Sequence, residues 1–223
     1  MRFKALAVDI DGTITDGRRR IQTVGIDALR AAEANGCPVI LATGNVLPVA
    51  HGLASFLGLS GPVVAENGGV VEYQGQMHLL GDGEESRRAY EHIRNSLEVE
   101  RLFTDRWRVS EVALLPTVDP YEVESRLSGF DVRVVASGFA IHLMPSGHSK
   151  MNGLRKAAQL LGVSTDEILA IGDSDNDASM LAGCGMGVAV GNASIKAKKA
   201  AGMTVSGKYS EGVREALLHF ELI

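Results

Sequence analysis

The 223-residue sequence contains few of the residues that mark specialised protein classes. It has two cysteines, one tryptophan, six prolines and 5% aromatic residues. No segment approaches the ~18 uncharged apolar residues that a membrane-spanning helix needs, so no membrane association is expected. Cys37 and Cys184 follow no metal-binding or redox spacing. This excludes a disulfide scaffold and predicts two small core residues of a protein in the reducing cytoplasm.

The remaining composition is that of a globular protein, with 45% hydrophobic and 22% charged residues. The net charge of −5 and the pI of 5.7 argue against a nucleic-acid-binding surface. A chain of this length can bury roughly 70% of its unfolded surface, so it needs no disulfide or metal to fold. Residues 3–9 form a short apolar run that ends at a carboxylate, which predicts a buried strand rather than a signal peptide.

The first part of the chain alternates short apolar runs with amphipathic segments. Three buried strands are expected, at residues 3–9, 38–43 and 62–66. Thr23 is expected to cap the first intervening helix. The second helix is expected to bury four side chains: Val49, Leu53, Phe56 and Leu57. Residues 70–73 and 77–80 predict a hairpin, and the strand–helix alternation before it predicts a parallel sheet.

Residues 83–148 have a different pattern, with a charge-dense amphipathic segment followed by short strands. A strand is expected at 108–115, a helix start at Asp119, and a second hairpin around Ser137-Gly138. Phe103 and Trp107 are expected to fill the core of this module. From Ser149 the strand–helix alternation returns. The sequence therefore predicts an α/β fold: a Rossmann-like parallel-sheet core of residues 1–82 and 149–223, interrupted by a small inserted α+β cap domain of residues 83–148.

The strongest chemical signal follows the first predicted strand, where residues 9–13 are Asp-Ile-Asp-Gly-Thr. In an open parallel sheet, ligands bind outside the carboxyl ends of the strands. Gly12 allows the chain to turn there, so that the carboxylates of Asp9 and Asp11 can reach one centre. The alternative is an ordinary strand end followed by an Asp-Gly turn.

A second acidic segment, Gly-Asp-Ser-Asp-Asn-Asp at residues 172–177, follows a later predicted strand. Carboxylates this close repel one another and are costly to bury without a compensating cation. Oxygen ligands of this kind suit a hard metal, magnesium before calcium. Asp173 and Asp177 are thus candidate metal ligands, and the alternative is a solvated turn that caps the next helix.

Two further segments have features of an anion site. Thr43-Gly44-Asn45 ends the second predicted strand and offers a hydroxyl group and backbone N–H groups at a helix N-terminus. Lys150 opens the helix after residue 149, where a cation opposes the helix dipole and is unfavourable unless an anion partners it. The alternatives are a structural loop and a surface lysine.

These four motifs, in this order, resemble those of the haloacid dehalogenase superfamily of aspartate-nucleophile phosphatases. The resemblance covers the whole predicted core, and the position of the insert is that of the type II cap members. The compact cap, residues 9–16 and Ala-Thr-Gly-Asn at 42–45 are similar to the archaeal phosphoglycolate phosphatases, whereas larger relatives usually carry arginine in place of Asn45. Lys150-Met-Asn-Gly153 departs from the Lys-Gly of many relatives, so the helix start is expected to differ locally.

The resemblance implies a role for each motif. Asp9 would be the nucleophile and Asp11 the general acid and base. Mg²⁺ would be bound by the Asp9 side chain, the Asp11 carbonyl and Asp173, with Asp177 in direct or indirect support. The phosphoryl oxygens would be bound by four residues: Thr43, Gly44, Asn45 and Lys150.

The cap implied by the same resemblance would cover the site and select a small anionic phosphomonoester, with 2-phosphoglycolate as the expected substrate. Arg106 and Arg108 are only candidate contacts for its carboxylate. The expected assembly is a monomer or a homodimer. Two alternatives remain: a phosphosugar phosphatase or phosphomutase of the same superfamily, and more distantly a phospho-accepting module resembling response-regulator receivers. Receivers are typically much shorter, carry no inserted cap and lack the Asp-x-Asp pair after the first strand.

Overall fold

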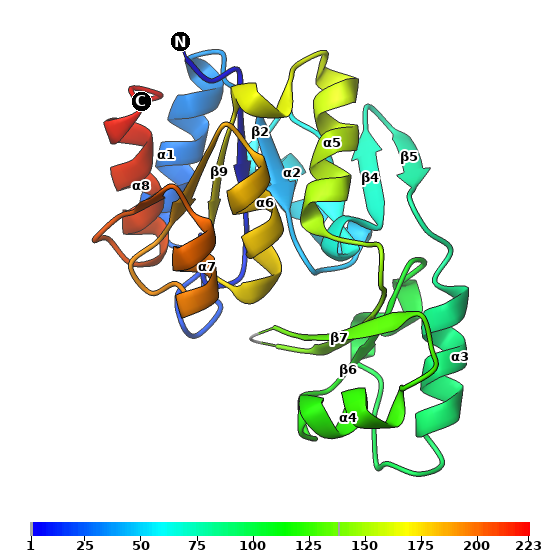
Figure 1. Ribbon diagram of the computed structural model, residues 1–223. Coiled ribbons are helices and arrows are strands. Elements are labelled where there is room, and N and C mark those ends of the chain that lie inside the picture. Colours follow the sequence, from blue (N-terminus) through cyan, green and yellow to red (C-terminus); the bar gives the residue numbers. More distant parts are fainter. Residues whose placement is uncertain (1, 138) are drawn as a thin grey trace.

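The larger part of the molecule is built on an eight-stranded sheet with the order β11-β10-β9-β1-β2-β3-β4-β5 (Figure 1). The computed structural model describes residues 2–137 and 139–223. The strands from β11 to β3 run parallel to one another. β4 pairs antiparallel with β3 and forms an antiparallel hairpin with β5 at one edge. The predicted parallel sheet and the hairpin at its edge are confirmed.

The central strands are short and buried on both faces, as expected for Val-, Ile-, Leu- and Ala-rich runs. The strands of this sheet are β1 (Ala5–Val8), β2 (Val39–Ala42), β3 (Val63–Ala65), β4 (Val70–Tyr73), β5 (Gln76–Leu79), β9 (Ile168–Gly172), β10 (Met186–Ala189) and β11 (Met203–Thr204). Every residue of β1, β2, β3 and β9 is buried. The strand ends that carry the motifs are thus fixed by the core of the molecule.

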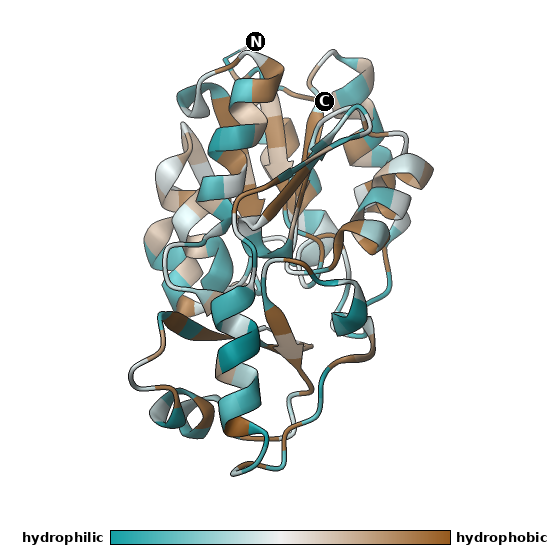
Figure 2. Ribbon diagram, turned by 90° about the vertical axis from the view of Figure 1, so that its right-hand side faces the viewer, coloured by the Kyte–Doolittle hydropathy of each residue, from teal (hydrophilic) through white to brown (hydrophobic). Residues whose placement is uncertain are grey.

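Helices cover both faces of the large sheet, and Figure 2 shows the apolar strands between them (Figure 2). These helices are α1 (Thr23–Ala34), α2 (Leu47–Leu57), α5 (Lys150–Leu161), α6 (Ala178–Gly183), α7 (Ile195–Ala200) and α8 (Tyr209–His219). The 3₁₀ turns of this part are η1 (Glu66–Gly68), η3 (Thr165–Glu167) and η4 (Asp175–Asp177). Helix α1 packs on α8 and α2, while α5, α6 and α7 pack in series. No helix in the described ranges is long and apolar enough to cross a membrane.

Two predictions about the first helices are wrong in detail. Helix α1 begins at Thr23 itself, and Gln22 precedes it without a side-chain cap. The buried residues of α2 are Ala50, Ala54 and Leu57. Val49 and Phe56, predicted on the inner face, are 46% and 85% exposed. The stripe at i, i+4 and i+7 uses small alanines, which let the helix approach the sheet closely and leave the larger side chains outside.

The inserted module carries its own antiparallel sheet, with the order β6-β8-β7, below the large sheet in Figure 1. Its elements are α3 (Glu84–Ile93), η2 (Phe103–Trp107), β6 (Val112–Leu114), α4 (Pro120–Arg126), β7 (Val132–Ala136) and β8 (Ile141–Pro145). Asp119 caps α4 by accepting a hydrogen bond from the Tyr121 N–H, as predicted. The predicted strand at 108–115 is shorter than expected. Gly138 of the predicted hairpin turn lies outside the described residues.

The two aromatic residues of η2 do not fill the core of the module, contrary to the prediction. Phe103 and Trp107 are 66% and 46% exposed. Between them, the buried Asp105 carboxylate accepts a hydrogen bond of 2.6 Å from the Ala113 N–H and pairs with Arg101. Because the short 3₁₀ turn directs Asp105 inward, the aromatic residues two positions away on either side face solvent.

Candidate active site

The predicted motifs meet because their strands are neighbours in the large sheet. Asp9 follows β1, Thr43 follows β2 and Asp173 follows β9, and the sheet order is β9-β1-β2. All three strands are parallel, so their carboxyl ends lie at one edge. Helix α5 brings Lys150 to the same edge. The structure therefore gathers residues that are more than 140 positions apart in the sequence.

Lys150 is completely buried between two carboxylates. Its Nζ atom lies 2.6 Å from Asp9 Oδ1 and 2.6 Å from Asp177 Oδ1. Burial acts to lower the pKa of Lys150, but the charges of Asp177 and Asp9 raise it above its usual value, so the side chain stays protonated. Ser149 caps α5 by accepting a hydrogen bond from Asn152 N–H, which fixes the helix start at the lysine. The surface-lysine alternative is wrong.

Three aspartates beside Lys150 form a cluster that can bind a cation. Ligand oxygens of Asp9, Asp173 and Asp177 all lie within 4.8 Å of one another. Asp9 Oδ2 is buried and has no hydrogen-bond partner among the described residues. Burial, followed by repulsion from Asp177, raises the pKa of Asp173 to about 7. Burial likewise raises the pKa of Asp9 well above its usual value. The cluster offers carboxylate oxygens and has more negative charge than Lys150 can balance. Such a set of ligands fits Mg²⁺.

Asp177 also holds the acidic loop in place. Its Oδ2 atom accepts hydrogen bonds from the backbone N–H groups of Asp173, at 3.0 Å, and Ser174, at 2.9 Å. Its other oxygen is the one paired with Lys150. Each carboxylate oxygen of Asp177 thus already has a partner, whereas Asp9 keeps one oxygen free.

Asp11 lies on the open side of the cluster and is held by two groups. Asn45 Nδ2 donates to Asp11 Oδ2 at 2.6 Å, and Arg19 Nε donates to Oδ1 at 2.7 Å. Asn45 is oriented in turn by Thr43 Oγ1, which accepts from the Asn45 N–H at 3.0 Å. Gly12 has the positive φ of 88° that the predicted turn requires. Thus Asn45 contacts Asp11 directly.

A cavity of about 250 Å³ opens onto these groups. Asp9, Asp11, Gly44 and Asp173 line its inner side, and the β7–β8 hairpin contributes Ser137 and Phe139. The inserted module therefore forms one wall of the candidate site.

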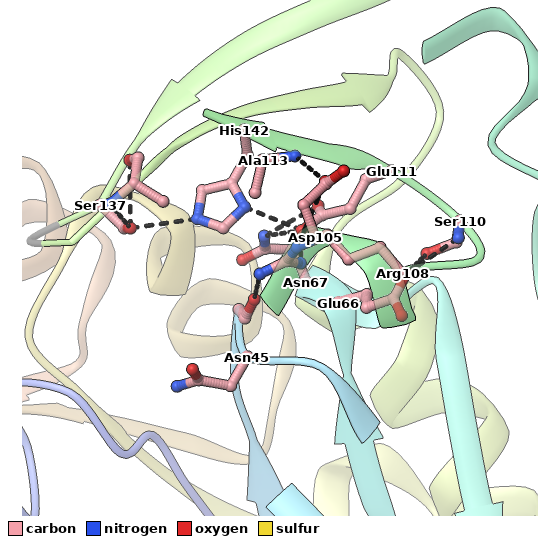
Figure 3. Close-up of polar contacts among 12 residues, drawn as sticks. Asn45, Glu66, Asn67, Asp105, Arg108, Ser110, Glu111, Ala113, Ser137 and His142 are labelled. Atoms are coloured by element: carbon pink, nitrogen blue, oxygen red, sulfur yellow. Dashed lines mark hydrogen bonds and ion pairs between the residues drawn. The ribbon is translucent and has the colours of Figure 1, made fainter. Parts of the chain in front are cut away.

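A buried polar network that was not predicted from the sequence joins the module to the core (Figure 3). The Glu66 carboxylate accepts from the Val109 and Ser110 N–H groups. Asn67 Nδ2 donates to Glu111 Oε2 at 3.0 Å. Glu66 and Asn67 have positive φ angles of 49° and 53°, which non-glycine residues rarely adopt. The signal in the sequence was Glu-Asn-Gly-Gly at 66–69, a polar run directly after a buried strand.

The same network includes Arg108, one of the two candidate carboxylate contacts. Arg108 is buried, pairs with Glu111, and donates to the Gly44 carbonyl at 2.8 Å. Glu111 also contacts His142 Nδ1 at 2.8 Å. Burial alone would raise the pKa of Glu111, but His142 and Arg108 hold it below its usual value. Arg106, the other candidate, lies over the Phe103 ring. Neither guanidinium lines the cavity described above.

The chain is similar to several known proteins over most of its length. The sequence profile of the haloacid dehalogenase-like hydrolases matches residues 6–101 and 122–217. A phosphoglycolate phosphatase of Methanothermobacter thermautotrophicus is 41% identical over 218 residues, covering 98% of this chain and 99% of the relative. A phosphoglycolate phosphatase of Archaeoglobus fulgidus is 41% identical over 222 residues, covering 99% and 98%.

The fold is also that of a solved structure. A crystal structure from Thermoplasma acidophilum superposes with a TM-score of 0.92 at 31% sequence identity, and the match covers 99% of each chain. The profile match and the full-length relatives exclude the receiver-like alternative. The chain belongs to the haloacid dehalogenase-like hydrolases.

Proposed function

We propose that this protein is a Mg²⁺-dependent phosphomonoester hydrolase that acts through a phospho-aspartate on Asp9, with 2-phosphoglycolate as its substrate. The observation that carries the proposal is the buried, unpartnered Oδ2 of Asp9, a residue that pairs with Lys150 and lines the cavity. An oxygen with no hydrogen bond to break is well suited to attack phosphorus. The substrate is inferred from the 41% identical relatives, which are named phosphoglycolate phosphatases.

In the proposed reaction, Asp9 Oδ2 attacks phosphorus and the bond from phosphorus to the glycolate oxygen breaks. Asp11 gives its proton to that departing oxygen. Asp11 then takes a proton from a water molecule as the water attacks the phospho-aspartate, and inorganic phosphate leaves. Asn45 keeps Asp11 in position through both steps, because it donates to the carboxylate oxygen opposite Arg19.

The charge on the phosphoryl group would be bound by Lys150 and by the loop of Thr43, Gly44 and Asn45. The carboxylates of Asp9 and Asp173 and the carbonyl of Asp11 would hold Mg²⁺, with Asp177 beside them. When bound, the ion supplies the positive charge that lets a carboxylate approach a dianionic phosphate.

Residues 83–148 are proposed to act as a cap that shields the site from water and selects the leaving group. The cavity of about 250 Å³ suits a small substrate. We further propose a cytoplasmic enzyme, in keeping with its two free cysteines. Burial raises the pKa of the Cys37 and Cys184 thiols to about 11 and about 12, which keeps them protonated and unreactive. Its proposed assembly is a monomer or homodimer.

The test is phosphate release from 2-phosphoglycolate, several sugar phosphates and p-nitrophenyl phosphate, with Mg²⁺ or with excess EDTA. We expect Mg²⁺-dependent release with a preference for 2-phosphoglycolate, and no turnover by Asp9→Asn. Asp27→Asn, on the exposed side of α1, is the matched control. Turnover in EDTA or by Asp9→Asn would refute the mechanism. A preference for sugar phosphates would refute the substrate only, and an isomerised product without free phosphate would indicate a mutase.

A further inference from the structure

Arg19 lies at the entrance of the catalytic cavity, on the loop between β1 and α1. Its Nε atom donates to Asp11 Oδ1 at 2.7 Å. The centre of its guanidinium group lies 4.4 Å from the centroid of the Phe139 ring, on the β7–β8 hairpin of the cap. Arg19 therefore contacts the proposed general acid and the cap at the same time.

The loop directs its three consecutive arginines to different places. Arg20 Nη2 pairs with Asp16 Oδ2 at 2.7 Å. The other oxygen of Asp16 accepts from the N–H groups of Arg18 and Arg20, which fixes the turn. Because Arg20 pairs with Asp16, Arg19 is not needed to balance that carboxylate. The guanidinium of Arg19 instead points its charge to the cavity, where it pairs with Asp11.

The charges that line the cavity show why this arginine matters. Asp9, Asp11, Asp16 and Asp173 line it, and Arg19 is the one arginine or lysine among its lining residues in the described part of the chain. Lys150 is buried behind the cavity, between Asp9 and Asp177. Of the charged residues that line the cavity in the described part of the chain, only Arg19 would attract a second anionic group next to the phosphate of a substrate.

We propose that Arg19 binds the carboxylate of the leaving group and so selects small phosphomonoesters that carry a carboxylate close to the ester oxygen. On binding, the guanidinium would exchange the Asp11 carboxylate for that of the substrate, while Asn45 retains Asp11. The planar fork of arginine suits bidentate binding of a carboxylate. Stacking on Phe139 leaves the edge of the guanidinium free to donate. The inference rests on the proposed phosphatase function.

Asp9 and Asp11 are two positions apart, so their Cα atoms are separated by roughly 7 Å at most. A substrate that places its phosphate at Asp9 and its carboxylate near Asp11 must therefore have a very short carbon chain between the two groups. Longer phosphomonoesters would place their second charge beyond Arg19.

The first test compares kcat/KM for 2-phosphoglycolate and for ethyl phosphate, in which a methyl group replaces the carboxylate. Arg19→Met should lower the value for 2-phosphoglycolate about 10- to 100-fold more than the value for ethyl phosphate, the range expected for hydrogen bonds to a charged group. Arg18→Met, in the same exposed loop, is the matched control and should leave the ratio of the two values unchanged. Equal losses on both substrates would show that Arg19 only positions Asp11, and would overturn the proposal.

The second test measures binding without turnover, by calorimetry with 3-phosphonopropionate and propylphosphonate. These are the non-hydrolysable counterparts of the two substrates. Arg19→Met should weaken the first about 10-fold or more relative to the second, and an unchanged ratio would overturn the proposal. This test separates the two hypotheses: a wild-type protein that releases phosphate from none of the phosphomonoesters in the panel above refutes the phosphatase function, while the binding ratio still decides the role of Arg19.

Discussion

Replacing Lys150 with methionine should destabilise the metal-free protein strongly, although it removes only one charge. The lysine is completely buried, and its ammonium group lies 2.6 Å from both Asp9 and Asp177. Methionine has a similar volume and fills the site without a large cavity. The substitution therefore leaves two buried carboxylates facing each other without a cation.

The size of the effect follows from that uncompensated charge. Removing one partner of a buried ion pair costs about 3–5 kcal/mol. The lysine also opposes the dipole at the start of α5, and its removal returns about 0.3–1 kcal/mol, which is too little to reverse the sign. For a protein of this size, a loss of about 3 kcal/mol lowers Tm by roughly 6–12 °C.

The assay is urea denaturation in EDTA near pH 8, with Lys156→Met as the matched control. Lys156 lies on the same helix, is partly exposed, and has no ion-pair partner within the described ranges. We expect the variant to lose about 3 kcal/mol or more and the control about 0.5 kcal/mol or less. Added Mg²⁺ should stabilise the variant more than the wild type, because the ion can replace the missing charge. A loss comparable to that of the control would refute the charge argument.

Two further predictions concern the acidic cluster. In the metal-free protein the raised pKa values of Asp9 and Asp173, the latter about 7, mean that the folded state keeps protons that the unfolded state releases above about pH 4. The free energy of unfolding in EDTA should therefore fall between about pH 4 and pH 7, and a rise over that range would contradict the assignment. Gly12→Ala should weaken Mg²⁺ binding, measured by calorimetry, because a Cβ at Gly12 would meet the Asp173 carboxylate, with Cγ only 2.9 Å away. Gly36→Ala has a similar φ of 82° and no neighbour within 4 Å, so it should cost stability alone; equal Mg²⁺ affinities of the two variants would refute the clash.

Much of the core of the site could be predicted from the sequence, because each motif directly follows a strongly apolar strand. A run such as Ala5–Val8 can only be buried in a sheet with helices on both faces, so the residues after it must lie at the edge of that sheet. Lys150 was detectable for a different reason: its position in the first turn of a helix is unfavourable without a nearby anion. Both arguments depend on local sequence and on general sheet geometry.

The features that could not be predicted from the sequence depend on contacts between distant segments. Nothing near Phe103 and Trp107 in the sequence shows that Asp105 is the inward residue, because its partner Ala113 is on a later strand. The Asn67–Glu111 hydrogen bond likewise joins residues 44 positions apart. Hydrophobic periodicity cannot detect such polar pairs, since it assigns charged residues to the surface.

The buried network fixes the position of the cap relative to the core. Arg108 links the cap to the Gly44 carbonyl, and His142 Nε2 contacts Ser137 Oγ on the wall of the cavity at 3.0 Å. Removing any one charged member would leave a buried partner unpaired, which is costly. The hairpin that carries Phe139 is therefore held at a defined place relative to the loop of Thr43, Gly44 and Asn45, the proposed phosphate-binding loop. Because Phe139 in turn stacks on Arg19, the position of the cap would determine, in the proposed complex, how far a carboxylate at Arg19 lies from a phosphate at Asp9. In this protein, selection by substrate length is therefore expected to depend on residues that never touch the substrate.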